Sequence, residues 1–252
     1  MLVRSWNLYH GNTSPPGRAN YLERMVRLAS EDAPEVLALQ EVPAWALAHL
    51  AGWSGMTALG DVAQRPMLGP LPSTAEVGRR LTALNPGLLR SAFSGQANAL
   101  LTTLEVLGRW RCALNPRGVR RRAGVDALSR FAWAKERRIC QAARLRLPDG
   151  ETAIVANLHA THGDARITVA EVERASSFAT GLAAPGEPVV LAGDFNTAPD
   201  LGAYGLDESG SGIDHVLVRG LPAGEQRAWP AERRRLDGVL LSDHAPVERE
   251  VG

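Results

Sequence analysis

The sequence has little of several features that define common protein classes. It holds only two cysteines, Cys112 and Cys140, which are too few for a disulfide framework or a cysteine-rich zinc site. No apolar stretch approaches the ~20 residues that a membrane-spanning helix needs. The formal net charge is only +1, which argues against a protein that holds nucleic acid mainly by bulk electrostatic attraction. The start of the chain does not resemble a signal peptide, so we expect a cytoplasmic protein without a membrane segment.

Lysine is nearly absent as well. Of the 28 basic residues only Lys135 is a lysine, and the others are arginines, whose planar guanidinium suits phosphate recognition. Four of these arginines form the Arg117–Arg122 cluster. It contains no aromatic residue, although surfaces that bind exposed bases usually carry stacking side chains. We expect a solvated loop that modulates substrate binding, and a phosphate-binding patch is the alternative interpretation.

What the sequence does contain is a series of short apolar runs bounded by glycine, proline and polar residues. With 252 residues, of which 45% are hydrophobic, the chain can build a substantial core. Strands are expected at residues 2–8, 36–39, 99–107, 138–147, 152–158, 188–192, 213–218, 236–241 and 245–251. Helices are expected at residues 22–29, 44–51, 73–84 and from Asp164 onward. Residues 108–136 are poorly patterned and are expected to form a loop.

The order of these elements favours one fold class. Several predicted strands follow each other without an intervening helix, so mixed sheets with helices outside are favoured over a purely doubly wound parallel sheet. The chain shows no internal repeat, low-complexity linker or break in composition. We therefore expect a single α/β domain over residues 1–252.

The tetrapeptide Gly-Asp-Phe-Asn at 193–196 is the most informative motif. It follows the apolar run 189–192 and precedes the breaker at 197–199, so it lies at the carboxyl end of a buried strand. Asp194 can bind a hard cation or accept a proton, and Asn196 can donate to a phosphoryl oxygen. Alone, these residues would be compatible with a simple polar turn.

Similar polar side chains follow most of the other predicted strands. They are Asn7, Glu41, Asn157, His159, Asp214, Asp243 and His244. Hydrolysis of a phosphoester requires a cation that neutralises non-bridging oxygens, an activated water and a proton source for the leaving oxygen. Because Mg²⁺ prefers one or two carboxylates plus water and substrate oxygens, Glu41 with Asp243 is a sufficient protein contribution.

The order and spacing of these groups resemble the endonuclease/exonuclease/phosphatase, or DNase-I-like, family. The resemblance rests on Trp-Asn-Leu at 6–8, Leu-Gln-Glu-Val at 39–42, Asn-Leu-His at 157–159, Gly-Asp-Phe-Asn at 193–196, Ile-Asp-His at 213–215 and Ser-Asp-His at 242–244. A weaker match is Glu-Arg-Arg at 136–138. The resemblance implies a four-layer αββα sandwich, with two mixed β-sheets face to face, helices outside and the site at one rim.

The resemblance also implies a metal site and a role for each matched residue. Asn7, Glu41 and Asp243 would lie at Mg²⁺ or Mn²⁺, with Glu41 the principal ligand. Asp194 would orient or deprotonate the attacking water, and Asn196 would hold the scissile phosphate.

Histidines supply the remaining implied roles. His244, paired with Asp214, is the other candidate base, and the choice between it and Asp194 stays open at this point. His159, supported by Glu136, would stabilise or protonate phosphoryl oxygens. Asn157 and His162 are expected to contact the substrate, and a surface-loop position is the alternative for His162.

Other polar residues near these motifs are expected to be structural or exposed. His10 and His49 are expected at the surface, and His215 is expected to face away from the site. Gln40 is expected to be structural, with a place in the water shell of the metal as the alternative.

The chain departs from the family at two of these motifs. It has Asn-Leu-His at 157–159 where the family often has Asn-Thr-His, and Gly-Ile-Asp-His at 212–215 where the family often has Arg-Ile-Asp-Tyr. The missing arginine removes an expected substrate contact and leaves the hydrolytic residues in place.

The leading hypothesis is a divalent-metal-dependent phosphodiesterase acting on a small-molecule or lipid-headgroup diester. An intracellular DNA or RNA nuclease is the alternative, which the near-neutral charge disfavours. A binding module that kept the fold and lost catalysis is the second alternative, and the complete set of polar residues argues against it.

Overall fold

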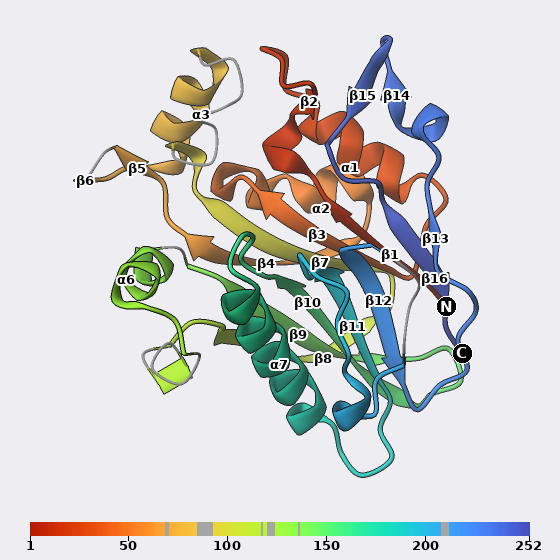
Figure 1. The fold of residues 1–252 in the computed structure, drawn as a ribbon. Coiled ribbons are helices and arrows are strands. Elements are labelled where there is room, and N and C mark those ends of the chain that lie inside the picture. The colour runs from red at the N-terminus through yellow and green to blue at the C-terminus, as the bar shows by residue number, and fades with distance from the viewer. Residues whose placement is uncertain (69–70, 85–92, 117, 120–123, 136, 208–211) are drawn as a thin grey trace.

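Two large β-sheets packed face to face form the centre of the protein in the computed structural model (Figure 1). The structure describes residues 1–252 except 69–70, 85–92, 117, 120–123, 136 and 208–211. The first sheet has the strand order β13-β16-β1-β3-β7-β4. Its strands are β13 (Arg227–Ala228), β16 (Val247–Glu250), β1 (Leu2–Asn7), β3 (Val36–Val42), β7 (Gln96–Thr102) and β4 (Thr57–Gln64).

The second sheet has the strand order β12-β11-β10-β9-β8. Its strands are β12 (Asp214–Arg219), β11 (Val189–Asp194), β10 (Thr152–His159), β9 (Ile139–Arg146) and β8 (Glu105–Ala113). Two small sheets, β14-β15-β2 and β5-β6, lie beside these large ones. Their strands are β14 (Arg235–Leu236), β15 (Val239–Leu241), β2 (Thr13–Ser14), β5 (Met67–Leu68) and β6 (Leu71–Pro72).

Helices cover the outer face of each large sheet. Parallel neighbours need a crossover connection, and α1 (Leu22–Ser30) connects β1 to β3, whereas α7 (Ala165–Leu182) connects β10 to β11. The carboxylate of Asp164 caps α7 by accepting from the backbone N–H of Arg166. α1 and α2 (Leu50–Ser54) lie on one outer side of the sandwich and α7 on the other (Figure 1). The predicted αββα sandwich of two mixed sheets is therefore confirmed.

Successive side chains along each strand point to opposite faces of the sheet, and this alternation divides the core into three apolar layers. In β3, Leu37 and Leu39 face α1, whereas Val36 and Ala38 face the opposite sheet. Strands buried on both faces read as continuous apolar runs, which explains why they stand out in the sequence. The same alternation in β10 sends Leu158 toward α7 and Val155 between the sheets.

Shorter helices lie in the connections. They include η1 (Tyr9–Gly11), η2 (Ala44–Ala48), α3 (Ala75–Leu84), α6 (Ala127–Lys135), η3 (Gly202–Tyr204) and η4 (Ala231–Arg234). Among the described residues, no helix is both long enough and apolar enough to cross a membrane.

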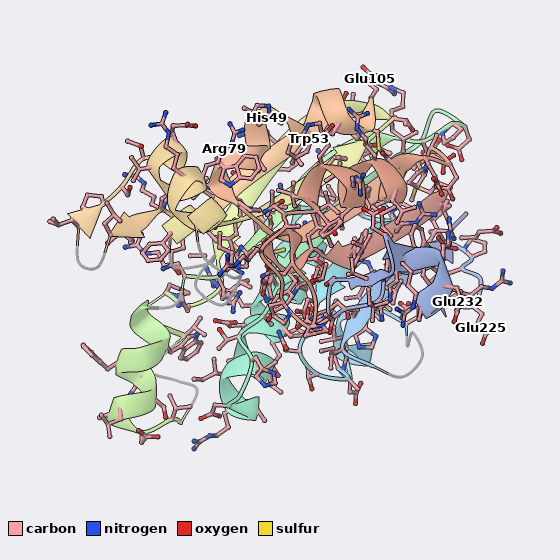
Figure 2. All side chains as sticks on the ribbon, turned by 90° about the horizontal axis from the view of Figure 1, so that it is seen from above. His49, Trp53, Arg79, Glu105, Glu225 and Glu232 are labelled. Carbon is pink, nitrogen blue, oxygen red and sulfur yellow. The ribbon has the colours of Figure 1, made fainter. Side chains whose placement is uncertain are left out.

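Aromatic side chains pack together where η2 and α2 meet α3. His49 stacks on Trp53 with ring centroids 5.4 Å apart, and Arg79 lies over Trp45. Figure 2 shows His49, Trp53 and Arg79 side by side on one side of the molecule. The predicted exposure of His49 is confirmed.

Two predictions for the middle of the chain are wrong, and one strand there was not predicted. The strand expected at 99–107 spans the turn between β7 and β8, and the loop expected at 108–136 contains the end of β8 and all of α6. β4 was not predicted. β4 and β8 are edge strands with mostly exposed or half-exposed residues, so they lack the apolar runs that identify the central strands. All four arginines of the Arg117–Arg122 cluster lie outside the described residues.

Candidate active site

Four strands end with a polar side chain in the space between the two sheets. Asn7 closes β1, His159 closes β10, Asp194 closes β11, and Asp214 opens the antiparallel β12. Each lies an even number of residues from an apolar side chain that faces the opposite sheet, such as Val3 in β1. Parallel register places His159 beside Asp194, and Asp214 pairs with Asp194 from the other side. The alternation of the strands therefore brings all four side chains to one rim.

Asp194 lies at the centre of this group and joins the two sheets. Its Oδ2 accepts a hydrogen bond from Asn7 Nδ2 at 2.9 Å, and its Oδ1 accepts from the backbone N–H of Asn196 at 2.9 Å. His159 Nε2 and His244 Nε2 lie 3.5 and 3.8 Å from Asp194 Oδ2. The side chain is 1% exposed, and burial, together with the charge of Asp214, raises the pKa of Asp194 to about 7.

The predicted pair of Asp214 and His244 is present. Asp214 Oδ2 accepts from His244 Nδ1 at 2.8 Å, which leaves Nε2 directed toward Asp194. Burial alone would lower the pKa of His244, but the hydrogen bond and charge of Asp214, with Asp194 and Asp243, raise it to about 9. The imidazole of His244 is therefore held in its charged form over the neutral pH range.

A tight turn fixes the segment that carries Asp243 and His244. Ser242 has a φ of 56°, and its Oγ donates to the backbone oxygen of Asn7 at 2.7 Å and accepts from the backbone N–H of His244 at 3.1 Å. Trp6 Nε1 donates to the backbone oxygen of His244 at 3.0 Å. The end of β1 thus holds this segment at the rim, although more than 230 residues of sequence separate the two.

Glu41 reaches the same rim through a break in the strand pattern. The pairing of β3 with β7 shifts between Leu39 and Val42, and Glu41 has a φ of 53°. Such a bulge redirects a side chain that simple alternation would send to the other face. Oε2 of Glu41 lies 3.1 Å from His10 Nε2, and Oε1 lies 3.8 Å from His159 Nε2. Burial would raise the pKa of Glu41, but His10, His159 and Arg138 outweigh it and hold that pKa well below its usual range.

His10 corrects a prediction. It was expected at the surface, yet it is 4% exposed and contacts Glu41. Tyr9 and His10 have φ values of 47° and 54°, which fold the chain back over the end of β3. Because His10 lies only three residues after Asn7, its position in the sequence indicated that it is near the site. The positive φ values that create the contact with Glu41 could not be predicted, since such values are expected mainly at glycine or asparagine.

His159 is held by two partners that sequence reasoning missed. Gln96 Nε2 and Arg138 Nη1 each lie 2.8 Å from His159 Nδ1. Burial and the charge of Arg138 lower the pKa of His159 well below its usual value, so the ring is neutral. Arg138 Nη1 also lies 3.1 Å from Nε2, and the carboxylates of Glu41 and Asp194 lie 3.8 and 3.5 Å from Nε2, so a proton on Nε2 would face two acceptors. Glu136, the expected partner, lies outside the described residues.

Asn196 and His162 extend the group along the rim. Asn196 has a φ of 52°, its Nδ2 donates to the backbone oxygen of Ala160 at 2.9 Å, and its Oδ1 lies 3.2 Å from His162 Nδ1. Gly193, one residue before Asp194, has a φ of 144°, and a Cβ there would meet Leu158 O at 2.0 Å. Only glycine fits this close approach of β11 to β10.

Asn157 corrects a second prediction, because the structure does not bring it to the rim. It is fully buried, and its Nδ2 donates to the backbone oxygens of Leu39 and Ala99 at 3.0 Å. Gln40 Nε2 donates to its Oδ1 at 2.8 Å, so Gln40 is structural as expected. Asn157 faces the same way as His159 but lies two residues deeper between the sheets, where no substrate contact is available.

Strained backbone is concentrated around these residues. Seven described non-glycine residues have positive φ, and five of them belong to the site or to its turns. Those five are Tyr9, His10, Glu41, Asn196 and Ser242. Such conformations cost of order 1–3 kcal/mol each and persist where the surroundings hold them, as at active sites.

The oxygen ligands at the rim fit a hard divalent cation. Burial raises the pKa of Tyr9, and the charges of Asp243 and Glu41 raise it further. Asn7 Oδ1 accepts from the backbone N–H of Tyr9 and keeps a second lone pair. Asp194, Asp214 and His244 also offer ligand atoms within 4.8 Å of one another, but Asp214 and His244 already bond to each other. Carboxylate and amide oxygens are the donors that Mg²⁺ and Mn²⁺ favour.

The model of the Endonuclease/Exonuclease/phosphatase family matches residues 5–251. The chain belongs to this family. Family members are phosphoesterases and nucleases that depend on divalent metal ions, so this chain is a metal-dependent hydrolase acting on phosphoester bonds. No curated protein matches it.

Solved structures with the same fold include proteins of different kinds. A conserved protein of unknown function from Enterococcus faecalis V583 has a TM-score of 0.70 at 16% identity, covering 100% of this chain and 99% of its own. A mannosyl-6-phosphatase from Bacteroides thetaiotaomicron VPI-5482 has a TM-score of 0.63 at 17% identity, covering 100% and 99%. A humanized D. rerio TDP2 has a TM-score of 0.65 at 13% identity, covering 100% and 98%. At these identities the likeness establishes the fold.

Proposed function

We propose that this protein hydrolyses a small phosphodiester, such as a lipid-headgroup or other small-molecule diester, with Mg²⁺ or Mn²⁺ as its cofactor. The observation that carries the proposal is the group around Asp194, in which Asn7 and Glu41 from one sheet meet His159 from the other and His244 from the last turn. This group supplies the cation site, the proton acceptor and the phosphate contacts that hydrolysis requires.

Glu41 and Asp243, with Asn7 beside them, would hold the divalent cation, which supplies positive charge against the non-bridging phosphoryl oxygens. The buried contacts of Glu41 support this role. His10 and His159 approach its two oxygens from different sides, so the carboxylate has a fixed orientation. Its low pKa keeps it ionised, as a cation ligand must be.

Asp194 takes the proton of the attacking water in this proposal. Asn7 and the backbone of Asn196 fix both of its oxygens, and burial raises its pKa to about 7, near the value that suits a general base at neutral pH. His244, charged and oriented by Asp214, contacts a phosphoryl oxygen and donates a hydrogen bond to it. His159 donates from its Nε2 in this proposal, because Gln96 lies at its Nδ1 and the acceptors Glu41 and Asp194 face its Nε2.

The charge of the chain supports a small substrate over a long nucleic acid. With a net charge of only +1, the protein lacks the excess of positive charge that duplex binding at physiological salt uses. The mannosyl-6-phosphatase among the solved structures supports small phosphoesters as substrates within this fold. A nuclease activity remains the alternative outcome of the test.

A substrate panel tests the proposal. Purified protein with Mg²⁺ is given four substrates: bis(p-nitrophenyl) phosphate, p-nitrophenyl phosphate, linear duplex DNA and single-stranded DNA. Asp194→Asn is the variant of the site, and Glu76→Gln, on the exposed face of α3, is the matched surface control. We expect the small diester to be cleaved with a higher kcat/KM than the monoester, and the DNA slowly. Asp194→Asn should abolish the turnover, and Glu76→Gln should leave it unchanged. Faster cleavage of DNA than of the small diester would replace the proposal with the nuclease alternative.

A further inference from the structure

A buried carboxylate outside the metal site lies directly behind the active-site rim. Glu171, on α7, is fully buried, and its oxygens accept from Trp133 Nε1 at 2.5 Å, from the backbone N–H of Thr161 at 2.7 Å and from Thr161 Oγ1 at 3.2 Å. Two of these partners are N–H groups, which can only donate, so Glu171 acts as an acceptor toward them, while burial raises the pKa of its carboxyl. Carboxylates are seldom fully buried unless they are paired or hydrogen-bonded, and this one binds donors from Trp133 and Thr161.

The donors of Glu171 belong to the loop that supports Asn196. Thr161 follows Ala160, whose backbone oxygen accepts from Asn196 Nδ2 at 2.9 Å and whose backbone N–H donates to the backbone oxygen of Asp194 at 2.9 Å. On the other side of Thr161, His162 Nδ1 lies 3.2 Å from Asn196 Oδ1. Both contacts that orient the Asn196 amide therefore come from the residues on either side of Thr161.

A second residue of α7 holds the same loop. Thr168, three positions before Glu171 and so on the same face of the helix, donates from Oγ1 to the backbone oxygen of Thr161 at 2.6 Å. The backbone N–H and C=O of Thr161 are thus both bound by side chains of one helix. Trp133 extends this attachment to α6, which places that helix against α7 next to the rim.

We infer that Glu171 is a positioning residue, which fixes the 160–162 loop through Thr161 and thereby holds Asn196 and His162 in the orientation that contacts the scissile phosphate. This inference rests on the proposed function for the role of Asn196. It assigns no contact between Glu171 and the substrate, since the carboxylate is fully buried behind the loop.

Glu171→Gln removes one acceptor oxygen and leaves the size of the side chain nearly unchanged. The carboxamide keeps one acceptor oxygen and turns a donor toward Thr161 or Trp133, so one buried donor loses its partner. We expect kcat/KM for bis(p-nitrophenyl) phosphate to fall by about 10-fold or more, in line with one unsatisfied buried hydrogen bond. The matched control is Glu187→Gln, near the other end of α7. The Glu187 carboxylate has 5% side-chain exposure and binds Arg144 and Thr152. This control should leave kcat/KM unchanged.

A double-mutant cycle distinguishes positioning from general destabilisation. If Glu171 acts through Asn196 and His162, then Glu171→Gln should cost no further activity in a variant that already carries Asn196→Ala and His162→Ala, which together form one arm of the cycle. Losses that multiply when Glu171→Gln is added would overturn the inference. Should Glu171→Gln not fold, Thr168→Val breaks the second attachment of the loop and should act in the same direction and through the same cycle.

An NMR measurement makes the inference testable without turnover. In ¹⁵N-labelled protein, Glu171→Gln should speed hydrogen exchange at the Thr161 amide and shift the side-chain amide signals of Asn196, and Glu187→Gln should do neither. Unchanged exchange and unchanged Asn196 signals would refute the positioning role whatever the kinetics show. If the exchange and the signals change but the natural chain cleaves no diester, the proposed function fails and the attachment of the loop by Glu171 stands.

Discussion

Replacement of Asp214 by asparagine tests how the charge of His244 is maintained. In the natural chain Asp214 Oδ2 accepts from His244 Nδ1 at 2.8 Å, and carboxylates raise the pKa of His244 from 6.5 to about 9. That shift corresponds to about 3 kcal/mol in favour of the charged form, at 1.36 kcal/mol per unit. Asp214→Asn keeps the size of the side chain but removes its charge, so the pKa of His244 should fall toward its ordinary value.

The expected loss of activity follows from the protonation of His244. At pH 8 a group with a pKa of about 9 is roughly nine-tenths protonated, whereas one with a pKa of ~7 is roughly one-tenth protonated. The change in charge alone therefore costs about 10-fold, and loss of the fixed orientation should bring the total to roughly 10²–10⁴.

The assay is the pH dependence of kcat/KM for bis(p-nitrophenyl) phosphate in the natural chain and in Asp214→Asn. The raised pKa of His244 means that its charged form is lost as pH rises through about 9, so activity should fall there in the natural chain. In Asp214→Asn this fall should begin at a lower pH. Asp237→Asn, at an exposed carboxylate on the β14–β15 turn, is the control and should leave the profile unchanged. An alkaline limb at the same pH in Asp214→Asn as in the natural chain would refute the reasoning.

Three further predictions concern coupling, substrate and stability. His244→Ala combined with Asp214→Asn should cost little more turnover than either alone, because coupled groups fail together; multiplied losses would show independent roles. Replacing the four arginines of the Arg117–Arg122 cluster with alanine should leave diester turnover intact. The nuclease alternative would be favoured if the natural chain bound duplex DNA tightly and the quadruple variant did not. In that case log K should fall linearly with log salt concentration, with a slope of ~0.9 for each phosphate contact. The hydrogen bond from Arg4 lowers the pKa of Asp32 to about 2, so the stability that this pair contributes is present above pH ~4 and is lost as the pH falls toward 2. Asp32→Asn should therefore flatten the acid part of a curve of Tm against pH. An unchanged slope in that part of the curve would contradict this prediction.

The central strands and the residues that end them could be predicted because one pattern determines both. A strand buried on two faces is a continuous apolar run, and the first polar side chain after it lies at the rim. Asp194 after 189–192 follows this rule. After 153–156 the first polar side chain is Asn157, which lies in the core, and His159, two residues later, is the one at the rim. The Asp214–His244 pair was also predictable, since a charged or basic histidine needs a partner.

The remaining features depend on geometry that residue types do not specify. His10 reaches Glu41 through two positive φ values and Glu41 reaches the rim through a bulge, and neither has a glycine to mark it. Arg138 reaches His159 from the start of β9, a strand beside β10, so their contact depends on strand order. Asn157 was placed at the site from its motif, whereas the depth of the sandwich puts it in the core.

The most direct test of the metal-dependent mechanism is turnover of bis(p-nitrophenyl) phosphate by metal-stripped protein as Mg²⁺ or Mn²⁺ is added back. Excess chelator should abolish the activity of the natural chain, and either cation should restore it. Glu41→Gln keeps the shape of the side chain and removes the charge of the proposed main ligand, so this variant should bind Mn²⁺ more weakly in calorimetry and recover little activity. Full turnover in excess chelator, or the same metal dependence in Glu41→Gln as in the natural chain, would contradict the account.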